Sequence, residues 1–171
     1  MISSSGDSLL AAIPWLQQLL LAGLVATRFA TAFALVPIFS DEVMPTTVRN
    51  SLIFTFGLIA FSLQMAPDVQ KLSAIGWAVL FAREAIVGTV IGLFFGTLLW
   101  AMTSAGELID SKIGATASQL PVPVGGFQTS LTGVFFARLG NYVFVAAGGI
   151  TLLVGTIMQS YTLWPLNAPL P

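Results

Sequence analysis

The sequence predicts an all-α protein built of hydrophobic helical hairpins that associate with a membrane. Hydrophobic residues make up 56% of the 171 residues and charged residues only 8%, against about 25% charged residues in a typical soluble domain. So few charges cannot cover a soluble core, which excludes a free water-soluble globule. Four long apolar runs follow one another along the chain, and no internal repeat divides them. We therefore expect one helical domain over residues 1–171.

Composition also excludes several classes of function. The net charge is −1, so the chain has no basic face for a nucleic acid. Cysteine and histidine are absent, which excludes disulfides, thiolate catalysis, a Ser–His triad and the usual zinc and haem sites. Neither phosphate-binding glycine motif is present. We expect no enzyme activity, no cofactor, no metal site and no nucleic-acid partner.

The first apolar run extends over Leu9–Phe39. The residues before it carry no Lys or Arg, so we do not interpret the N-terminus as a secretory signal. Pro14 lies near the start of the run, where proline is tolerated. Pro37 marks its predicted end or a kink.

Two further runs follow after short polar breaks. Ser40–Pro45 separates the first run from Ser51–Ala66, and Pro67–Lys71 precedes Leu72–Ile109. Within the second break, Asp68 is placed to cap the next helix. A straight helix over the third run would be about 57 Å long, well beyond a hydrocarbon core of ~30 Å. Either this run breaks, or lipid does not surround its whole length.

A re-entrant loop is predicted before the last run, Leu131–Tyr161. Residues 113–137 carry no charge, yet they are rich in the residues that interrupt helices, Gly114, Pro121, Pro123, Gly125 and Gly126. Irregular apolar backbone at membrane depth is tolerated only inside protein or along a water-filled cavity. After the last run, the proline-rich end from Trp164 cannot continue a helix.

Small residues at a spacing of four define one face of the third run. An ordinary helix–helix contact explains such a face most simply, because small residues let two backbones approach. The sharper interpretation is a subunit-packing face that also carries a buried carboxylate. The residues are Glu84, Gly88, Gly92 and Gly96.

A buried carboxylate at Glu84 requires a compensating group. Arg83 is adjacent and should point elsewhere on a helix, so Arg28 or Arg49, from other helices, is the expected partner. A proton-carrying role for Glu84 is an alternative.

The third run has a polar end. Glu107 and Asp110 are three residues apart and share a face, whereas Asp110 and Lys112 do not. The simplest interpretation is a helix end in water or headgroups. The alternatives are a cation-attracting rim or a pairing surface for another subunit.

Three blocks, in this order, resemble the FliR/SctT family of export-gate membrane subunits of bacterial type III secretion systems. They are Arg28–Phe39 with Pro45–Arg49, then Glu84-x-x-x-Gly88-x-x-x-Gly92, then Gly106–Asp110 with Gly114. The resemblance covers roughly Leu16–Pro165. The ending Gln159–Pro165 is more similar to the injectisome branch (SctT, also named YscT or HrcT) than to the flagellar one.

The resemblance implies a structural, pore-forming subunit that passes unfolded substrate proteins across the bacterial inner membrane. One copy would join several copies of two small membrane proteins, the P/R-type and Q/S-type subunits, and would meet the large export-gate subunit and membrane lipid. Much of such an assembly sits above the plane of the inner membrane. Family members usually continue with another helical hairpin, so we expect that hairpin to be absent here.

The uncharged loop would then enter the pore and help to close it. Its glycines supply hinges, its prolines deny helical continuity, and its apolar side chains suit a dewetted constriction. A packed connector without a gating role is the alternative. The predicted pore residues are Gly114, Gln119, Leu120, Pro121, Val122, Pro123, Gly125, Gly126 and Phe127.

Two other classes of protein remain as alternatives. In a secondary transporter or permease component, Glu84 or Asp110 would carry coupling protons and the loop would be a broken helix at a substrate site. Such a transporter should show symmetry between its halves, and the sequence shows none. A membrane enzyme comes last, because the chain lacks His, Cys and a paired-Asp intramembrane protease pattern.

Overall fold

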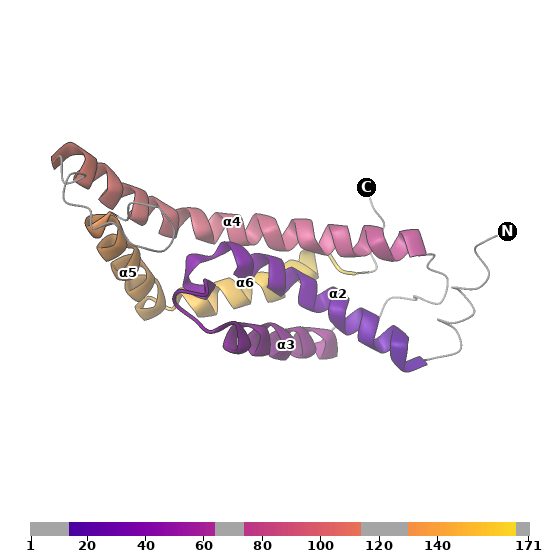
Figure 1. The fold of residues 1–171 in the computed structure, drawn as a ribbon. Helices are drawn as coiled ribbons and strands as arrows, with labels where there is room; N and C mark the ends of the chain where they lie inside the picture. The colour runs from indigo at the N-terminus through magenta and orange to yellow at the C-terminus, as the bar shows by residue number, and fades with distance from the viewer. Residues whose placement is uncertain (1–13, 64–73, 114–129, 167–171) are drawn as a thin grey trace.

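All the regular elements in the described part of the chain are helices, which confirms the predicted fold class. The structure is a computed structural model that describes residues 14–63, 74–113 and 130–166. Its elements, in chain order, are α2 (Pro14–Leu35), the short 3-10 helix η1 (Pro37–Phe39), α3 (Thr46–Leu63), α4 (Ala74–Ile113), α5 (Leu131–Ala146) and α6 (Gly149–Leu163). The molecule is elongated, and α4 runs along its whole length (Figure 1).

Proline sets the boundary between α2 and α3. The helix α2 ends at Leu35, and Pro37 opens η1 after Val36 turns extended (φ −92°, ψ 116°). The prediction of an end or a kink at Pro37 is confirmed. Helix α3 begins at Thr46, directly after Pro45 and five residues before the predicted apolar run, because a proline at a helix start fixes φ at a helical value.

Helix α4 is a single unbroken helix of 40 residues. At 1.5 Å per residue it is about 60 Å long. Of the two alternatives for the third apolar run, the break is therefore wrong. Arg83 and Glu84 do not interrupt the helix, because both side chains are buried and bonded to other parts of the chain.

The last apolar run is not one helix. Helices α5 and α6 meet at an angle of 66°, and Gly148 between them has φ +80°. This left-handed conformation favours glycine over any residue with a Cβ atom. By length and composition, three described helices could cross a membrane, or four if the bent pair forms one span.

Helix α2 lies at the centre of the hydrophobic core. The side chains of Leu24, Val25, Phe29 and Ala32 have no exposed surface. The ring of Phe33 stacks on that of Phe39 from η1, with centroids 4.0 Å apart. Helices α3, α4 and α6 surround α2 (Figure 1), and Leu153 and Ile157 of α6 are completely buried.

The glycine face of α4 packs against α2 of the same chain. A Cβ atom at Gly88 would lie 2.3 Å from the Arg28 carbonyl oxygen, and one at Gly92 would lie 2.5 Å from that of Ala32. A Cβ atom at Gly96 would lie 2.5 Å from the Leu35 oxygen. The structure thus shows the ordinary helix–helix contact. The interpretation of this face as a subunit-packing surface requires correction, because α2 already occupies it.

Replacing Gly92 should separate α2 from α4. We expect Gly92→Leu to lower the free energy of unfolding by roughly 1–3 kcal/mol or more, because the new side chain would overlap the α2 backbone. Gly23→Ala is the matched control, since nothing lies within 4 Å of its added Cβ atom. Thermal unfolding in detergent, followed by circular dichroism, measures both variants. Equal midpoints for Gly92→Leu and the unmodified protein would contradict the packing described here.

Candidate functional site

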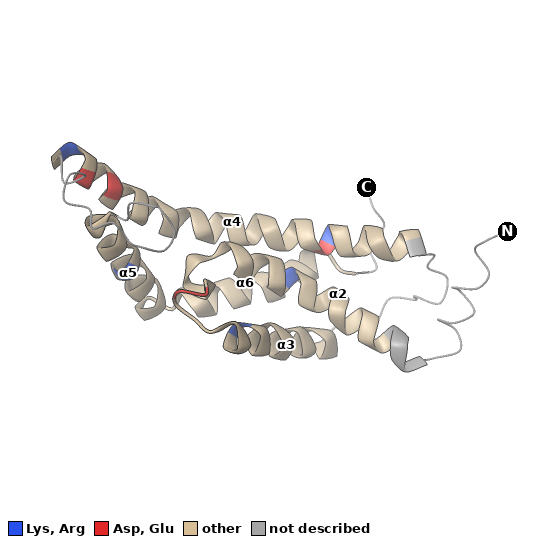
Figure 2. Cartoon of the chain, in the orientation of Figure 1, with Lys and Arg blue, Asp and Glu red and all other residues tan. Residues whose placement is uncertain are grey.

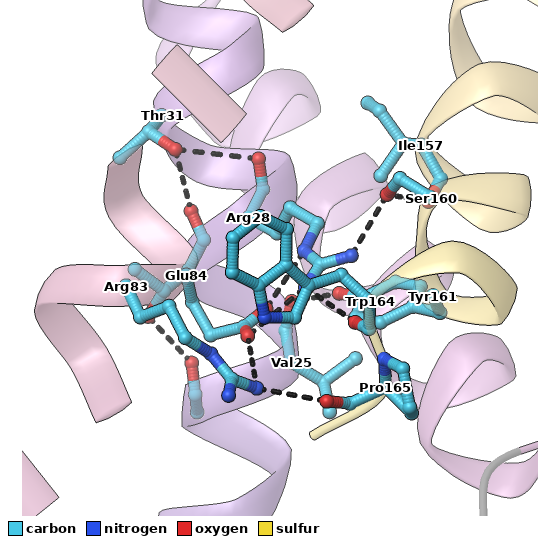
Figure 3. Close-up of polar contacts among 12 residues, drawn as sticks. Val25, Arg28, Thr31, Arg83, Glu84, Ile157, Ser160, Tyr161, Trp164 and Pro165 are labelled. Atoms are coloured by element: carbon cyan, nitrogen blue, oxygen red, sulfur yellow. Dashed lines mark hydrogen bonds and ion pairs between the residues drawn. The ribbon is translucent and has the colours of Figure 1, made fainter. Parts of the chain in front are cut away.

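An ion pair between α2 and α4 lies in the middle of the molecule. Arg28 Nε is 2.7 Å from Glu84 Oε2, and Arg28 Nη2 is 2.9 Å from Oε1 (Figure 3). Neither side chain has any exposed surface. The two parallel contacts form the bidentate geometry that matches a guanidinium to a carboxylate. The expectation that an arginine from another helix pairs with Glu84 is confirmed.

Arg28 also binds the end of α6. Its Nη1 donates to Ser160 Oγ at 2.8 Å and its Nη2 reaches the Trp164 carbonyl oxygen at 3.4 Å. The guanidinium carbon lies 3.8 Å from the centre of the Tyr161 ring, which forms a cation–π contact. The Tyr161 hydroxyl in turn donates to the Val25 carbonyl oxygen at 2.9 Å. One arginine therefore joins α2, α4 and α6.

Arg83 belongs to the same cluster, which corrects the expectation that it points elsewhere. Its side chain is buried, and its Nη2 donates to the Pro165 carbonyl oxygen at 2.9 Å. The same nitrogen lies 3.5 Å from Glu84 Oε1. The directions of adjacent Cβ atoms on a helix diverge, but the long arginine side chain bends back over the carboxylate (Figure 3).

Arg49, the other expected partner of Glu84, lies elsewhere. Its Nη1 is 3.2 Å from Asp41 Oδ1 and donates to the Phe39 carbonyl oxygen at 3.0 Å. This pair is at the surface, with 70% of the Asp41 side chain exposed. It ties the start of α3 to the turn after η1.

The central cluster, formed by Arg28, Arg83 and Glu84 with their partners at the end of α6, has a structural role. Both Glu84 oxygens contact guanidinium nitrogens, so the carboxylate is compensated where it is buried. The arrangement gives no support to a proton-carrying role, because the Glu84 side chain is completely buried and both of its oxygens contact arginine nitrogens. Sequence reasoning missed Ser160, Tyr161 and the carbonyl groups of Trp164 and Pro165. Ser160 and Tyr161 are polar residues within an apolar run, and this pattern could have indicated a buried polar contact.

A second polar cluster joins the end of α4 to the start of α5. Asp110 is 6% exposed. Its Oδ2 accepts from Ser130 Oγ at 2.5 Å and from the Thr132 backbone N–H at 3.0 Å, and Oδ1 accepts from the Thr132 hydroxyl. Glu107 is exposed and shares none of these contacts. Asp110 is thus bonded to α5, whereas Glu107 lines the surface, and a cation-attracting rim at this end of α4 stays a prediction.

A groove of about 850 Å³ lies between the end of α2, the turn after η1, α4 and α5. Its charged lining residues are Asp41, Glu42, Glu107 and Arg138. Within the described ranges, no group of three His, Cys, Asp or Glu side chains could hold a metal ion. The predicted capping residue Asp68 and the predicted pore residues Gly114, Gln119, Leu120, Pro121, Val122, Pro123, Gly125, Gly126 and Phe127 lie outside the described residues, so their roles stay predictions.

Comparison with known proteins gives a consistent set of similarities. The family model described as "Bacterial export proteins, family 1" matches residues 19–171. Yop proteins translocation protein T of Yersinia pestis is 27% identical over 149 residues, which cover 86% of this chain and 57% of the relative. Surface presentation of antigens protein SpaR of Shigella flexneri is 29% identical over 150 residues, with the same coverage.

A flagellar protein is also similar. Flagellar biosynthetic protein FliR of Caulobacter vibrioides is 26% identical over 157 residues, 90% of this chain and 62% of the relative. The chain thus spans little more than half the length of these curated relatives.

Breaking the central ion pair should destabilise the fold. We expect Glu84→Leu to cost about 3–5 kcal/mol of unfolding free energy, because Arg28 would stay buried without its carboxylate. Glu84→Gln should cost less, since the amide still accepts a hydrogen bond. Thermal unfolding in detergent measures both.

The double variant Arg28→Met/Glu84→Leu provides the control for charge. It leaves no buried partner of the pair uncompensated, so its loss should be smaller than the sum of the two single losses. Strict additivity would show that the two side chains do not stabilise each other.

Proposed function

Because the chain belongs to family 1 of the bacterial export proteins, we propose that it is a structural, non-enzymatic subunit of the export gate of a type III secretion system. The match over residues 19–171 carries this proposal, and it agrees with the resemblance to the FliR/SctT family. We also propose that the subunit lines a pore for unfolded substrate proteins in the bacterial inner membrane. Its partners would be the P/R-type and Q/S-type subunits and the large export-gate subunit.

The names of the relatives support this system. They include proteins named for Yop translocation, for surface presentation of antigens and for flagellar biosynthesis. The first two agree with an injectisome rather than a flagellum, as does the sequence at the end of α6.

The surface of α4 supports a role inside an assembly. Between Ala74 and Gly106 its only charged residues are Arg83 and Glu84, and both are buried. Figure 2 shows the other charges of α4 gathered at its C-terminal end. This uncharged part is about 50 Å long at 1.5 Å per residue, whereas a bilayer offers a hydrocarbon core of ~30 Å.

Large apolar side chains project from this part of α4. Five of them are more than 60% exposed: Ile75, Ile86, Val90, Phe94 and Leu98. Lipid can cover only part of such a length, and the remainder needs an apolar protein surface. We therefore propose that partner subunits complete the cover of α4.

No observation favours the secondary transporter. The sequence shows no symmetry between halves. Of the two carboxylates named as proton carriers in that alternative, Glu84 contacts two arginines and Asp110 accepts hydrogen bonds from Ser130 and Thr132.

Purification from host membranes in mild detergent tests the proposed function. We expect the tagged chain to remain in one stable complex with two small hydrophobic proteins of the P/R and Q/S types. Deleting the gene should stop secretion of type III substrates, and the unmodified chain should restore it. A lone monomer or a symmetric dimer, with secretion intact after deletion, would contradict an export-gate subunit.

The same proposal predicts poor behaviour of the isolated chain. Expressed without partners, the protein should aggregate or be degraded, because the exposed apolar length of α4 exceeds what detergent or lipid covers as a single belt. Size-exclusion chromatography measures this, and co-expression with the P/R-type and Q/S-type subunits is the control. A monodisperse, folded monomer would count against the proposal.

A further inference from the structure

We propose that Asp110 is a positioning residue whose carboxylate fastens the start of α5 to the end of α4. It thereby holds together the two ends of the segment 114–129. Three donors converge on this one carboxylate: the Ser130 hydroxyl, the Thr132 backbone N–H and the Thr132 hydroxyl. All three belong to residues at the start of α5, whereas Asp110 lies in the last turn of α4.

The carboxylate extends the capping of α5. Ser130 is the N-cap of this helix, and its Oγ accepts from the Gly133 backbone N–H at 2.8 Å. The same hydroxyl donates to Asp110, and Thr132 adds a second N–H that has no partner inside the helix. Asp110 thus supplies, from a different helix, the negative charge that a helix N-terminus favours.

Hydrogen bonds rather than ion pairing orient Asp110. The charged residues nearest along α4 are Glu107 and Lys112, and α5 contributes Arg138; all three are exposed. No ion pair among the described residues includes Asp110. The donors at the start of α5 therefore orient the Asp110 carboxylate, and the carboxylate in turn holds the start of α5 against α4.

Close backbone contact fixes where the two helices meet. A Cβ atom at Gly106 would lie 2.6 Å from the Thr132 carbonyl oxygen, and one at Gly140 would lie 3.2 Å from the Met102 side chain. Helix α5 therefore lies along α4, and its far end leaves through the glycine turn at Gly148. Within the described residues, the Arg28 cluster makes no hydrogen bond to α5. Loss of Asp110 should therefore free the start of α5 and leave the centre of the molecule intact.

Distances between spin labels test this directly. The chain has no native cysteine, so nitroxides can be placed at Lys112→Cys on α4 and at Leu131→Cys on α5. Both positions are exposed and lie next to the Asp110 contacts in the sequence. A second pair at Gln18→Cys and Ile75→Cys reports the packing of α2 against α4. Electron double resonance is recorded on the full chain purified from membranes in mild detergent, with whatever proteins remain bound to it.

We expect Asp110→Ala to broaden and lengthen the 112–131 distance distribution and to leave the 18–75 distribution unchanged. A hydrogen bond to a carboxylate corresponds to on the order of tenfold in an equilibrium constant, so the open population should rise at least about tenfold. Thr132→Val, which removes one of the three donors, should act in the same direction but less. Ser111→Ala is the matched control, because Ser111 is exposed and its Oγ donates to the Leu108 carbonyl oxygen of its own helix.

An unchanged 112–131 distribution in Asp110→Ala would overturn the proposal. So would a parallel change in the 18–75 distribution, because Asp110 would then support the whole fold. The effect on export rests on the proposed function: Asp110→Ala should lower secretion while the complex still assembles, and Ser111→Ala should not. If the label distances respond but no export complex exists, the proposed function is wrong, and the positioning role of Asp110 is still supported.

Discussion

The arrangement of helices depends on the bidentate contact between Arg28 and Glu84. Both side chains are completely buried, and a charge in such surroundings is tolerated only when its partner and its remaining hydrogen bonds are in place. This requirement sets the depth of α2 against α4, and the glycines of α4 then let the two backbones touch. Because Arg28 also reaches Ser160 and Tyr161, the same requirement fixes the end of α6. Three helices are thus placed by one guanidinium group.

Different interactions hold the two ends of α4 against their neighbouring helices. Toward its N-terminal half, buried charge and small residues bind α2 and α6. At its C-terminal end, a carboxylate receives neutral donors from α5, and the charged side chains around it are exposed. Helix α5 therefore belongs to the outer end of α4 and not to the central cluster, although α6 follows it directly in the chain.

Much of this architecture could be predicted from the sequence, because a few residue types each allow few structural alternatives. Composition determined the helical class, Pro37 ended α2, and a buried carboxylate at Glu84 required an arginine from another helix. The features that sequence reasoning missed depend on three-dimensional geometry, which the spacing of residues along the chain does not determine. The reach of the Arg83 side chain, the carbonyl groups after α6 and the 66° angle at Gly148 all follow from tertiary packing. The spacing of the glycines on α4 shows that a neighbouring backbone is close, but it does not show to which chain that backbone belongs.

The wide sequence separation within the Arg28 cluster has a consequence for biosynthesis. Glu84 follows Arg28 by 56 positions and Ser160 by 132. While the ribosome is still making α3, the newly made α2 carries an arginine that has no counter-ion yet, and such a helix is costly to leave in lipid. Final placement of α2 must therefore wait for α4, and the cluster closes only when α6 has emerged. Of the three helices that Arg28 joins, α6 is therefore the last to be made.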